Sequence, residues 1–364
     1  MMFYLAAFIF VFTAIQLLVV ATNLIFKSSV KGHNFIDNPL ISILIPARNE
    51  EKNIGTVLND LIIQNYQNIE IFVFDDQSED LTAVIVTAMA KTDSRIKLIR
   101  SPGLPSGWLG KNFACYSLAM KAKGAYFLFL DADVRVGKDI IRSAIAYAEK
   151  YQLGLLTVFP EQIVITPGEK MTVPIMNYIL LSLLPLPLVK WSAYKSLAAA
   201  NGQFMLFNSS AYIRLNPHEH VKNCKVEDIE IVRFFKEKRI PVACLTGNES
   251  IRCRMYNRFG DAVEGFSKNI LAFFGDSFLL ALMFWLTTTF GFIPVLISFP
   301  LNFFIVFIVM YLLIRLFVSI VSHQRIMDSF LYIIPLQLVM GLIIIHSFLN
   351  KYFFHFQWKG RSIG

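Results

Sequence analysis

Long uncharged stretches occupy both ends of the chain. They cover residues 3–26, 277–299, 301–322, which Arg315 interrupts, and 329–349. An apolar helix of about 20 residues is long enough to span the roughly 30 Å core of a bilayer. The pattern predicts an N-terminal transmembrane anchor and several C-terminal transmembrane segments. The boundaries that we expect are 1–30 for the anchor, 275–350 for the C-terminal segments and 351–364 for a basic tail.

The intervening region, about 240 residues long, alternates short apolar runs with amphipathic ones and is long enough for one substantial domain. Strands are expected over 40–45, 69–74, 96–99 and 126–130, and helices over 52–64, 81–91, 112–123 and 140–150. Strands that alternate with helices are typical of an α/β fold with a doubly wound parallel sheet. We expect this domain to cover residues 38–274.

Residues 171–189 are uncharged but contain Pro174, Pro185 and Pro187. Proline interrupts a straight helix, so a simple crossing is disfavoured. An in-plane or re-entrant segment at the membrane interface is the favoured interpretation. A buried linker within the domain is the alternative.

Composition supports a membrane protein. The chain is 55% hydrophobic, has a mean hydropathy of +0.54 and carries a net charge of +8. A positive charge favours contact with anionic lipid headgroups, whereas no basic stripe or motif indicates nucleic-acid binding. The four cysteines have no metal-ligand spacing and are expected to be reduced thiols.

Lys27 and Lys31 follow the first apolar stretch, and nothing basic precedes it. The positive-inside rule therefore places the central domain in the cytoplasm, on a multi-pass protein of the cell (plasma) membrane. Three further crossings would leave the basic tail outside. Either one C-terminal segment is re-entrant or the tail breaks the rule.

Polar clusters come directly after three of the expected strands: residues 47–50, Asp75-Asp76 and Asp131-Ala132-Asp133. In parallel sheets ligands bind beyond these carboxyl ends. Asp131 and Asp133, one residue apart, point to the same side, and Mg²⁺ shared with phosphates is a natural partner. Capping of the next helix is the alternative. With no Gly-rich fingerprint or P-loop, we expect a nucleotide site based on carboxylates and metal.

Six motifs follow one another along the chain. They are Ile45-Pro46-Ala47-Arg48-Asn49-Glu50, Asp75-Asp76-Gln77-Ser78-Glu79-Asp80, Gly107-Trp108-Leu109-Gly110-Lys111-Asn112, Asp131-Ala132-Asp133, Asn201-Gly202-Gln203 and Glu227-Asp228. Together they resemble the family-2 glycosyltransferases with a GT-A fold, and the likeness covers residues 41 to about 274.

The resemblance implies roles for these residues. Donor-binding residues would be Pro46, Arg48, Glu50, Asp75, Asp76, Lys111 and Asp131. Asp133 and Asp131 would hold Mg²⁺ or Mn²⁺, and Asp228 would be the general base of an inverting transfer. The alternatives are a turn for one of Asp75 and Asp76, a solvated Lys111, and an acidic first helical turn for Glu227 and Asp228.

A Gln-x-x-Arg-Trp motif, found in processive synthases, is absent, which argues for transfer of a single sugar. Arg252, Arg254 and the segment 264–269 resemble the diaponeurosporenoate (carotenoid acid) glucosyltransferase subgroup. The acceptor residues it implies are Gln203, Glu227, Arg252 and Arg254. His218 stands where relatives show Gly-Gly-His, and a satisfied loop histidine is the favoured interpretation.

We therefore expect an inverting glycosyltransferase that moves one sugar, from a UDP-hexose donor, to a membrane lipid such as a carotenoid acid. Other acceptors in the same class are a ceramide, a hopanoid, a diacylglycerol or a polyisoprenyl phosphate. A transporter subunit or an inactive membrane scaffold are alternatives of another class. Few charges within the apolar stretches count against transport, and intact Asp131, Asp133 and Asp228 count against a scaffold.

Overall fold

The computed structural model describes residues 1–27, 30, 37–353, 356–358 and 361–363. The chain forms two compact units. We call them the sheet unit (Ser28–Glu161 and Leu186–Cys253) and the apolar unit (Met1–Lys27, Gln162–Pro185 and Arg254–Gly364). Lys31 and Lys359 lie outside the described residues.

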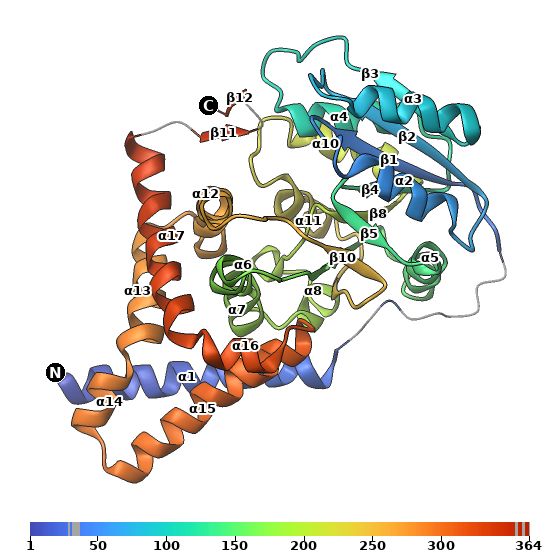
Figure 1. The fold of residues 1–364 in the computed structure, drawn as a ribbon. Coiled ribbons are helices and arrows are strands. Elements are labelled where there is room, and N and C mark those ends of the chain that lie inside the picture. Colours follow the sequence, from blue (N-terminus) through green and yellow to red (C-terminus); the bar gives the residue numbers. More distant parts are fainter. Residues whose placement is uncertain (28–29, 31–36, 354–355, 359–360, 364) are drawn as a thin grey trace. The chain divides into compact units, whose positions relative to one another are not determined.

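A seven-stranded sheet forms the centre of the sheet unit, with the order β3-β2-β1-β4-β8-β6-β9 (Figure 1). Its strands are β1 (Ile41–Ala47), β2 (Ile69–Asp75), β3 (Ile96–Arg100), β4 (Tyr126–Leu130), β6 (Leu155–Phe159), β8 (Phe204–Asn208) and β9 (Val242–Thr246). The first four are parallel, as predicted. β8 runs antiparallel to β4 and β6, which the helix–strand alternation of the first half did not reveal.

Helices cover both faces of this sheet. They are α2 (Ile54–Ile62), α3 (Thr82–Thr92), α4 (Gly110–Ala119), α5 (Ile140–Lys150), α8 (Pro187–Trp191), α9 (Ser209–Leu215), α10 (Pro217–His220) and α11 (Glu227–Glu237), with a 3₁₀ turn at Lys195–Leu197. Ile41, Ile43 and Ile45 share one face of β1 and form a core with apolar residues of α2, α3 and α5. α4 packs on β1 and β2 from outside that core, so the architecture is layered α/β.

Strand register fixes where the polar motifs meet. Ala47 pairs with Asp75, and Leu44 pairs with Phe129, so β1, β2 and β4 end at the same edge of the sheet. The three clusters that follow these strands therefore share that edge. A small second sheet, in which β5 (Val134–Val136) pairs with β10 (Ile251–Cys253), lies just after the Asp131-Ala132-Asp133 motif; β7 (Glu161–Gln162) is its third strand.

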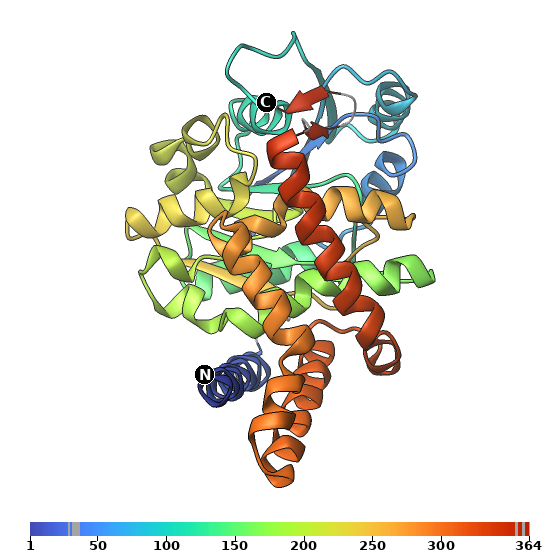
Figure 2. The ribbon, with the colours of Figure 1, turned by 90° about the vertical axis from the view of Figure 1, so that its left-hand side faces the viewer.

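The apolar unit is almost entirely helical (Figure 2). Its helices are α1 (Met2–Ile25), α6 (Pro167–Thr172), α7 (Pro174–Leu183), α12 (Phe259–Asn269), a 3₁₀ turn (Ile270–Phe274), α13 (Phe278–Phe290), α14 (Phe292–Ser298), α15 (Leu301–Val321), α16 (Ile326–Leu331) and α17 (Ile333–Phe353). A short hairpin of β11 (Phe356–Trp358) and β12 (Arg361–Ile363) follows.

Three of the described helices are long and apolar enough to cross a membrane: Met2–Ile25, Leu301–Val321 and Ile333–Asn350. A fourth candidate combines Phe259–Phe274 with Phe278–Phe290, but this pair bends by 98°. The uncharged stretch 277–299 is thus not one straight helix, because Gly291 separates α13 from α14.

The proline-rich stretch 171–189 divides between the two units. α7 belongs to the apolar unit, where Asn23 donates hydrogen bonds to the carbonyl oxygens of Leu181 and Leu184, both at 2.9 Å. α8 belongs to the sheet unit, where Lys236 donates to the carbonyl oxygen of Val189 at 2.8 Å. Prolines at the start of both helices explain the break.

Gly124, just before β4, lies against the backbone of β1. An added Cβ would lie 2.6 Å from the Ser42 nitrogen and 2.7 Å from the Leu40 oxygen. We expect Gly124→Ala to lower the free energy of unfolding by about 1–3 kcal/mol, because β1 and β4 must separate to accommodate the methyl group. Gly55→Ala is the matched control, since its Cβ would make an ordinary 3.5 Å contact with Ile85. Equal melting temperatures for the two variants would contradict this prediction.

Candidate active site

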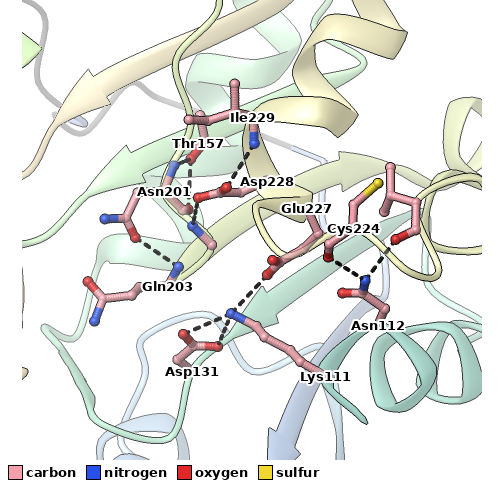
Figure 3. A network of polar contacts seen from close by, with 12 residues as sticks. Lys111, Asn112, Asp131, Thr157, Asn201, Gln203, Cys224, Glu227, Asp228 and Ile229 are labelled. Atoms are coloured by element: carbon pink, nitrogen blue, oxygen red, sulfur yellow. Dashed lines mark hydrogen bonds and ion pairs between the residues drawn. The ribbon is translucent and has the colours of Figure 1, made fainter. Parts of the chain in front are cut away.

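Lys111 stands at the centre of a charged cluster at the carboxyl edge of the sheet. Its Nζ lies 3.1 Å from Asp131 Oδ1 and 3.3 Å from Glu227 Oε1 (Figure 3). Lys111 comes from the first turn of α4, Asp131 follows β4, and Glu227 begins α11. Three elements that are distant in the sequence thus meet through one ammonium group.

The two neighbouring carboxylates determine the protonation state of Lys111. Burial alone would lower the pKa of Lys111, but the carboxylates of Asp131 and Glu227 outweigh burial and raise that pKa well above its usual value. Lys111 is therefore a permanent cation at neutral pH. Its side chain is 27% exposed, so an incoming anion can reach it.

Asp228 is held by backbone groups. Gly202 N donates to Asp228 Oδ2 at 3.0 Å, and Ile229 N donates to Asp228 Oδ1 at 2.8 Å. Burial, reinforced by the charge of Glu227, raises the pKa of Asp228 to about 7. A fixed carboxylate with a pKa near neutrality has the properties of a general base.

Gly202 lies between Asp228 and Lys111. An added Cβ there would lie 3.0 Å from Lys111 Nζ, 3.3 Å from Glu227 Oε1 and 3.7 Å from Asp228 Cβ. Only a residue without a side chain leaves the space between these groups unfilled. The sequence did not predict this spacing role of Gly202, although Gly202 stands in the Asn201-Gly202-Gln203 motif.

Asn112 has a structural role that the sequence did not predict. Its Nδ2 donates to the carbonyl oxygens of Val221 at 2.8 Å and Cys224 at 3.0 Å. These bonds hold the loop that leads into α11, and so they bring Glu227 to Lys111 (Figure 3). Its position next to Lys111 in the motif was the one available signal.

The residues proposed to bind metal fit a hard divalent cation. Asp133 Oδ1 is buried and has no N–H or O–H donor in the part of the chain that the structure describes. Burial, then the charges of Asp131 and Glu50, raises the pKa of Asp133 to about 7, so the site already holds excess negative charge. Among the described residues no three side chains of His, Cys, Asp or Glu form a metal cluster. A cation at Asp131 and Asp133 would take its other oxygen ligands from phosphates and water.

A second polar group lies at the ends of β1 and β2. Arg48 donates through one guanidinium nitrogen to the carbonyl oxygens of Asp76 at 2.6 Å and Gln77 at 3.1 Å. Asp75 Oδ1 accepts from Ser78 N at 3.1 Å, so Asp75 is the member of the acidic pair that shapes the turn.

The remaining predicted site residues occupy different places. Pro46 lies within β1, and Glu50 accepts from Asn53 Nδ2 at 2.8 Å. Gln203 is buried, and its carbonyl oxygen accepts from Asp131 N at 3.1 Å. Arg252 is exposed on β10.

Arg254 belongs to the apolar unit. Its Nη2 lies 2.8 Å from Oε1 of the fully buried Glu169, which also closes the capping box of α6. The positive charge of Arg254 is therefore already compensated by a carboxylate. No comparable ion pair was foreseen, because Glu169 is 85 residues away in the sequence.

The strand order and the carboxylate-lined edge define an α/β fold of the GT-A type. In agreement, a solved mannosyltransferase from Pyrobaculum calidifontis, in complex with GDP-Man and Mn²⁺, superimposes with a TM-score of 0.59. The alignment covers 96% of this chain and 100% of that protein at 13% identity, which establishes the fold alone.

Residues 42–213 match glycosyl transferase family 2. A 4,4'-diaponeurosporenoate glycosyltransferase from Staphylococcus haemolyticus is 28% identical over 239 residues, which is 63% of this chain and 60% of that protein. Proteins of the same name from Staphylococcus aureus are 28% identical over 271 residues, covering 70% of this chain and 68% of theirs. The family-2 match and these relatives support the resemblance to family-2 glycosyltransferases that the motifs predicted.

His218 is a satisfied buried histidine, as expected, although it lies in α10 rather than in a loop. Its Nδ1 is 2.7 Å from the Tyr212 hydroxyl, and its ring packs 4.7 Å from that of Phe129. Burial, with a smaller effect of Lys111, lowers the pKa of His218 from 6.5 to about 3. It is therefore neutral at physiological pH.

This lowered pKa makes stability depend on pH. Between pH 6.5 and 3 the unfolded chain protonates His218 and the folded chain does not. The contribution of neutral His218 to the free energy of unfolding is therefore complete above pH 6.5 and is lost as pH falls. We expect His218→Phe to unfold with a weaker dependence on pH between 7 and 5 than the unmodified protein. Denaturant titrations at both pH values measure this, and parallel dependences would contradict the assignment.

Proposed function

We propose that this protein transfers one hexose, with inversion, from a UDP-sugar to a lipid acceptor in the membrane, and that the acceptor is a carotenoid acid. One observation carries the proposal: a buried carboxylate, Asp228, and a cation, Lys111, flank the same backbone position, Gly202. Inverting transfer needs a base and a group that stabilises the departing diphosphate on opposite sides of the sugar.

The chemistry follows from these positions. The carboxylate of a carotenoid acid is already deprotonated and would attack the anomeric carbon directly, whereas for a hydroxyl acceptor Asp228 would accept the proton while the hydroxyl oxygen attacks. The bond from that carbon to the diphosphate oxygen breaks, and Lys111 balances the charge of the released UDP. A divalent cation at Asp131 and Asp133, when bound, would supply further charge neutralisation to the diphosphate. Arg48 and Asp76 would position the nucleobase.

The donor class and the metal are supported by the Pyrobaculum calidifontis structure, which contains a nucleotide sugar and Mn²⁺. The acceptor is supported by the names of the staphylococcal relatives. Three helices of membrane-spanning length fit an acceptor that never leaves the bilayer. We further propose a multi-pass protein of the plasma membrane whose catalytic sheet unit is cytoplasmic.

Purified membranes that contain the protein test this function directly. Incubation with radiolabelled UDP-hexoses and a carotenoid acid should yield a labelled lipid, identified by mass spectrometry. Chelation should abolish transfer and Mn²⁺ or Mg²⁺ should restore it, because Asp131 and Asp133 hold diphosphate through a cation. Labelled soluble sugar with no lipid product would refute the proposal of a membrane acceptor. Full activity after exhaustive chelation would refute the proposed role of the metal.

Asp228→Asn separates binding from chemistry. With a hydroxyl acceptor, transfer should fall by about 10²–10⁴-fold while UDP affinity is retained, because the loss of a base leaves the donor contacts in place. The unmodified protein should gain activity as pH rises through about 7, where Asp228 ionises. A carboxylic acid acceptor is already deprotonated, so its transfer should fall less. Near-normal transfer to a hydroxyl acceptor by Asp228→Asn would disprove the assignment.

A further inference from the structure

A short loop with two exposed aromatic side chains follows the point where the chain passes from the apolar unit to the sheet unit. We call residues 191–196 the aromatic loop. Trp191 is 57% exposed and Tyr194 is 76% exposed, and the chemistry proposed above uses neither. Trp and Tyr combine an apolar ring with a polar atom, and they are enriched where a protein meets the interface between a bilayer and water.

Lys236 fixes the backbone of this loop against α11. Its Nζ donates to the carbonyl oxygens of Val189 at 2.8 Å and Ser192 at 2.7 Å, which lie on either side of the first aromatic residue. Lys236 is itself buried, and Lys195 of the loop forms an ion pair with Glu237 of the same helix. The aromatic rings are therefore exposed on a backbone that is held in place.

The sequence connects this loop closely to the ends of the apolar helices. Within the apolar unit, Asn23 in the last turn of α1 donates to the carbonyl oxygen of Leu184, the residue after α7. Lys27, just beyond α1, donates to the carbonyl oxygen of Ile320 near the end of α15 at 2.9 Å, so these two helices end close together. From Leu184 to Trp191, with α8 between them, the chain spans at most about 20 Å. The loop can thus reach the surface where the helices leave the bilayer.

The end of α11 adds positive charge beside the aromatic loop. Lys238 and Arg239 are exposed there, and the side chain of Lys195 is 57% exposed. Glu237 is the one acidic residue in the segments 190–196 and 236–239. Basic side chains near a membrane surface are attracted to anionic headgroups, so the charge of this region also fits a lipid surface.

We propose that the aromatic loop binds the lipid headgroup layer through Trp191 and Tyr194, and thereby fixes the distance of the active-site edge from the bilayer. α11 connects the two. Asp228 lies in its first turn and Lys236 in its last, about 12 Å apart along the helix axis at 1.5 Å per residue. The effect on catalysis rests on the transfer proposed above, whereas the lipid contact does not.

Quenching of a fluorescent label by lipids tests the contact in the full-length protein. Ser196→Cys places a pyrene label in the loop and keeps both aromatic side chains, and Cys224→Ser removes the one native thiol that is not buried. The vesicles contain phosphatidylcholine, phosphatidylglycerol and a lipid with a doxyl quencher on its acyl chain. The label should lose about half or more of its emission, because the headgroup layer is only about 5–8 Å thick.

Val84→Cys, labelled in the same way, is the matched control. Val84 is 63% exposed on α3, which packs on β3, whereas α8 packs on β9 at the other end of the strand order. Its label should not be quenched. Replacing Trp191 and Tyr194 together by serine should lower the quenching of the Ser196→Cys label to the level of this control, because the loop then loses both interfacial rings.

Quenching of the loop label no stronger than that of the control would overturn the proposal. So would quenching that is unchanged when both aromatic residues are serine. Pyrene excimer emission without lipid quenching would show that two copies of the chain meet through the loop, and would overturn it as well.

Transfer by the double variant, Trp191→Ser with Tyr194→Ser, separates this inference from the proposed function. Its kcat/KM for a lipid acceptor should fall by roughly 10–100-fold, because small displacements of reacting groups cost rate on this order, while UDP affinity should not change. Normal transfer after loss of quenching would overturn the positioning role. Strong quenching in an unmodified protein that transfers no sugar would refute the transferase function and leave the lipid contact standing.

Discussion

The ammonium group of Lys111 permits several carboxylates to share one edge of the sheet. Asp131, Asp133, Glu227 and Asp228 would repel one another across a partly desolvated space, and Lys111 pairs directly with Asp131 and Glu227. Isolated charges of this kind are expensive to bury, whereas paired ones are tolerated. The pairing also connects α11 to the loop after β4, so the local fold and the charge balance depend on the same contact.

Lys111 does not compensate all of the negative charge. The pKa values of Asp133 and Asp228 remain raised to about 7, first because both groups are buried and then because carboxylates surround them. The edge of the sheet therefore favours the binding of additional positive charge at Asp133. An incoming diphosphate would compete with Asp131 and Glu227 for Lys111, and a cation at Asp131 would relieve that competition. Binding of metal and donor should therefore be favourable together rather than separately.

Much of this edge could be predicted from the sequence, because parallel strands end side by side. The apolar runs before Asp75 and Asp131 identified β2 and β4, and register then brings their following residues together. What the sequence did not reveal depends on contacts between distant segments. The bond from Asn112 to Val221 crosses 109 residues, and no local pattern encodes it.

The antiparallel strand β8 illustrates the same limit. Its five residues, Phe204–Asn208, form an apolar run that fits either direction, since side-chain alternation is independent of strand polarity. Its direction is set by the path of the preceding chain, which passes through α7 in the apolar unit before it returns. Gln203 and Gly202 reach the site because this strand begins, rather than ends, at the carboxyl edge of its neighbours.

Two requirements on a catalytic base conflict, and the structure meets both at Asp228, the proposed base. A base must be held in place, which calls for hydrogen bonds, but hydrogen bonds to a carboxylate lower its pKa and weaken it as a base. Two backbone N–H groups, of Gly202 and Ile229, hold Asp228. Their effect is outweighed by burial and by the charge of Glu227, so the pKa stays near 7. Glu227 and Asp228 therefore act together. Glu227 holds Lys111 in place, and its charge also helps to keep the pKa of Asp228 near 7.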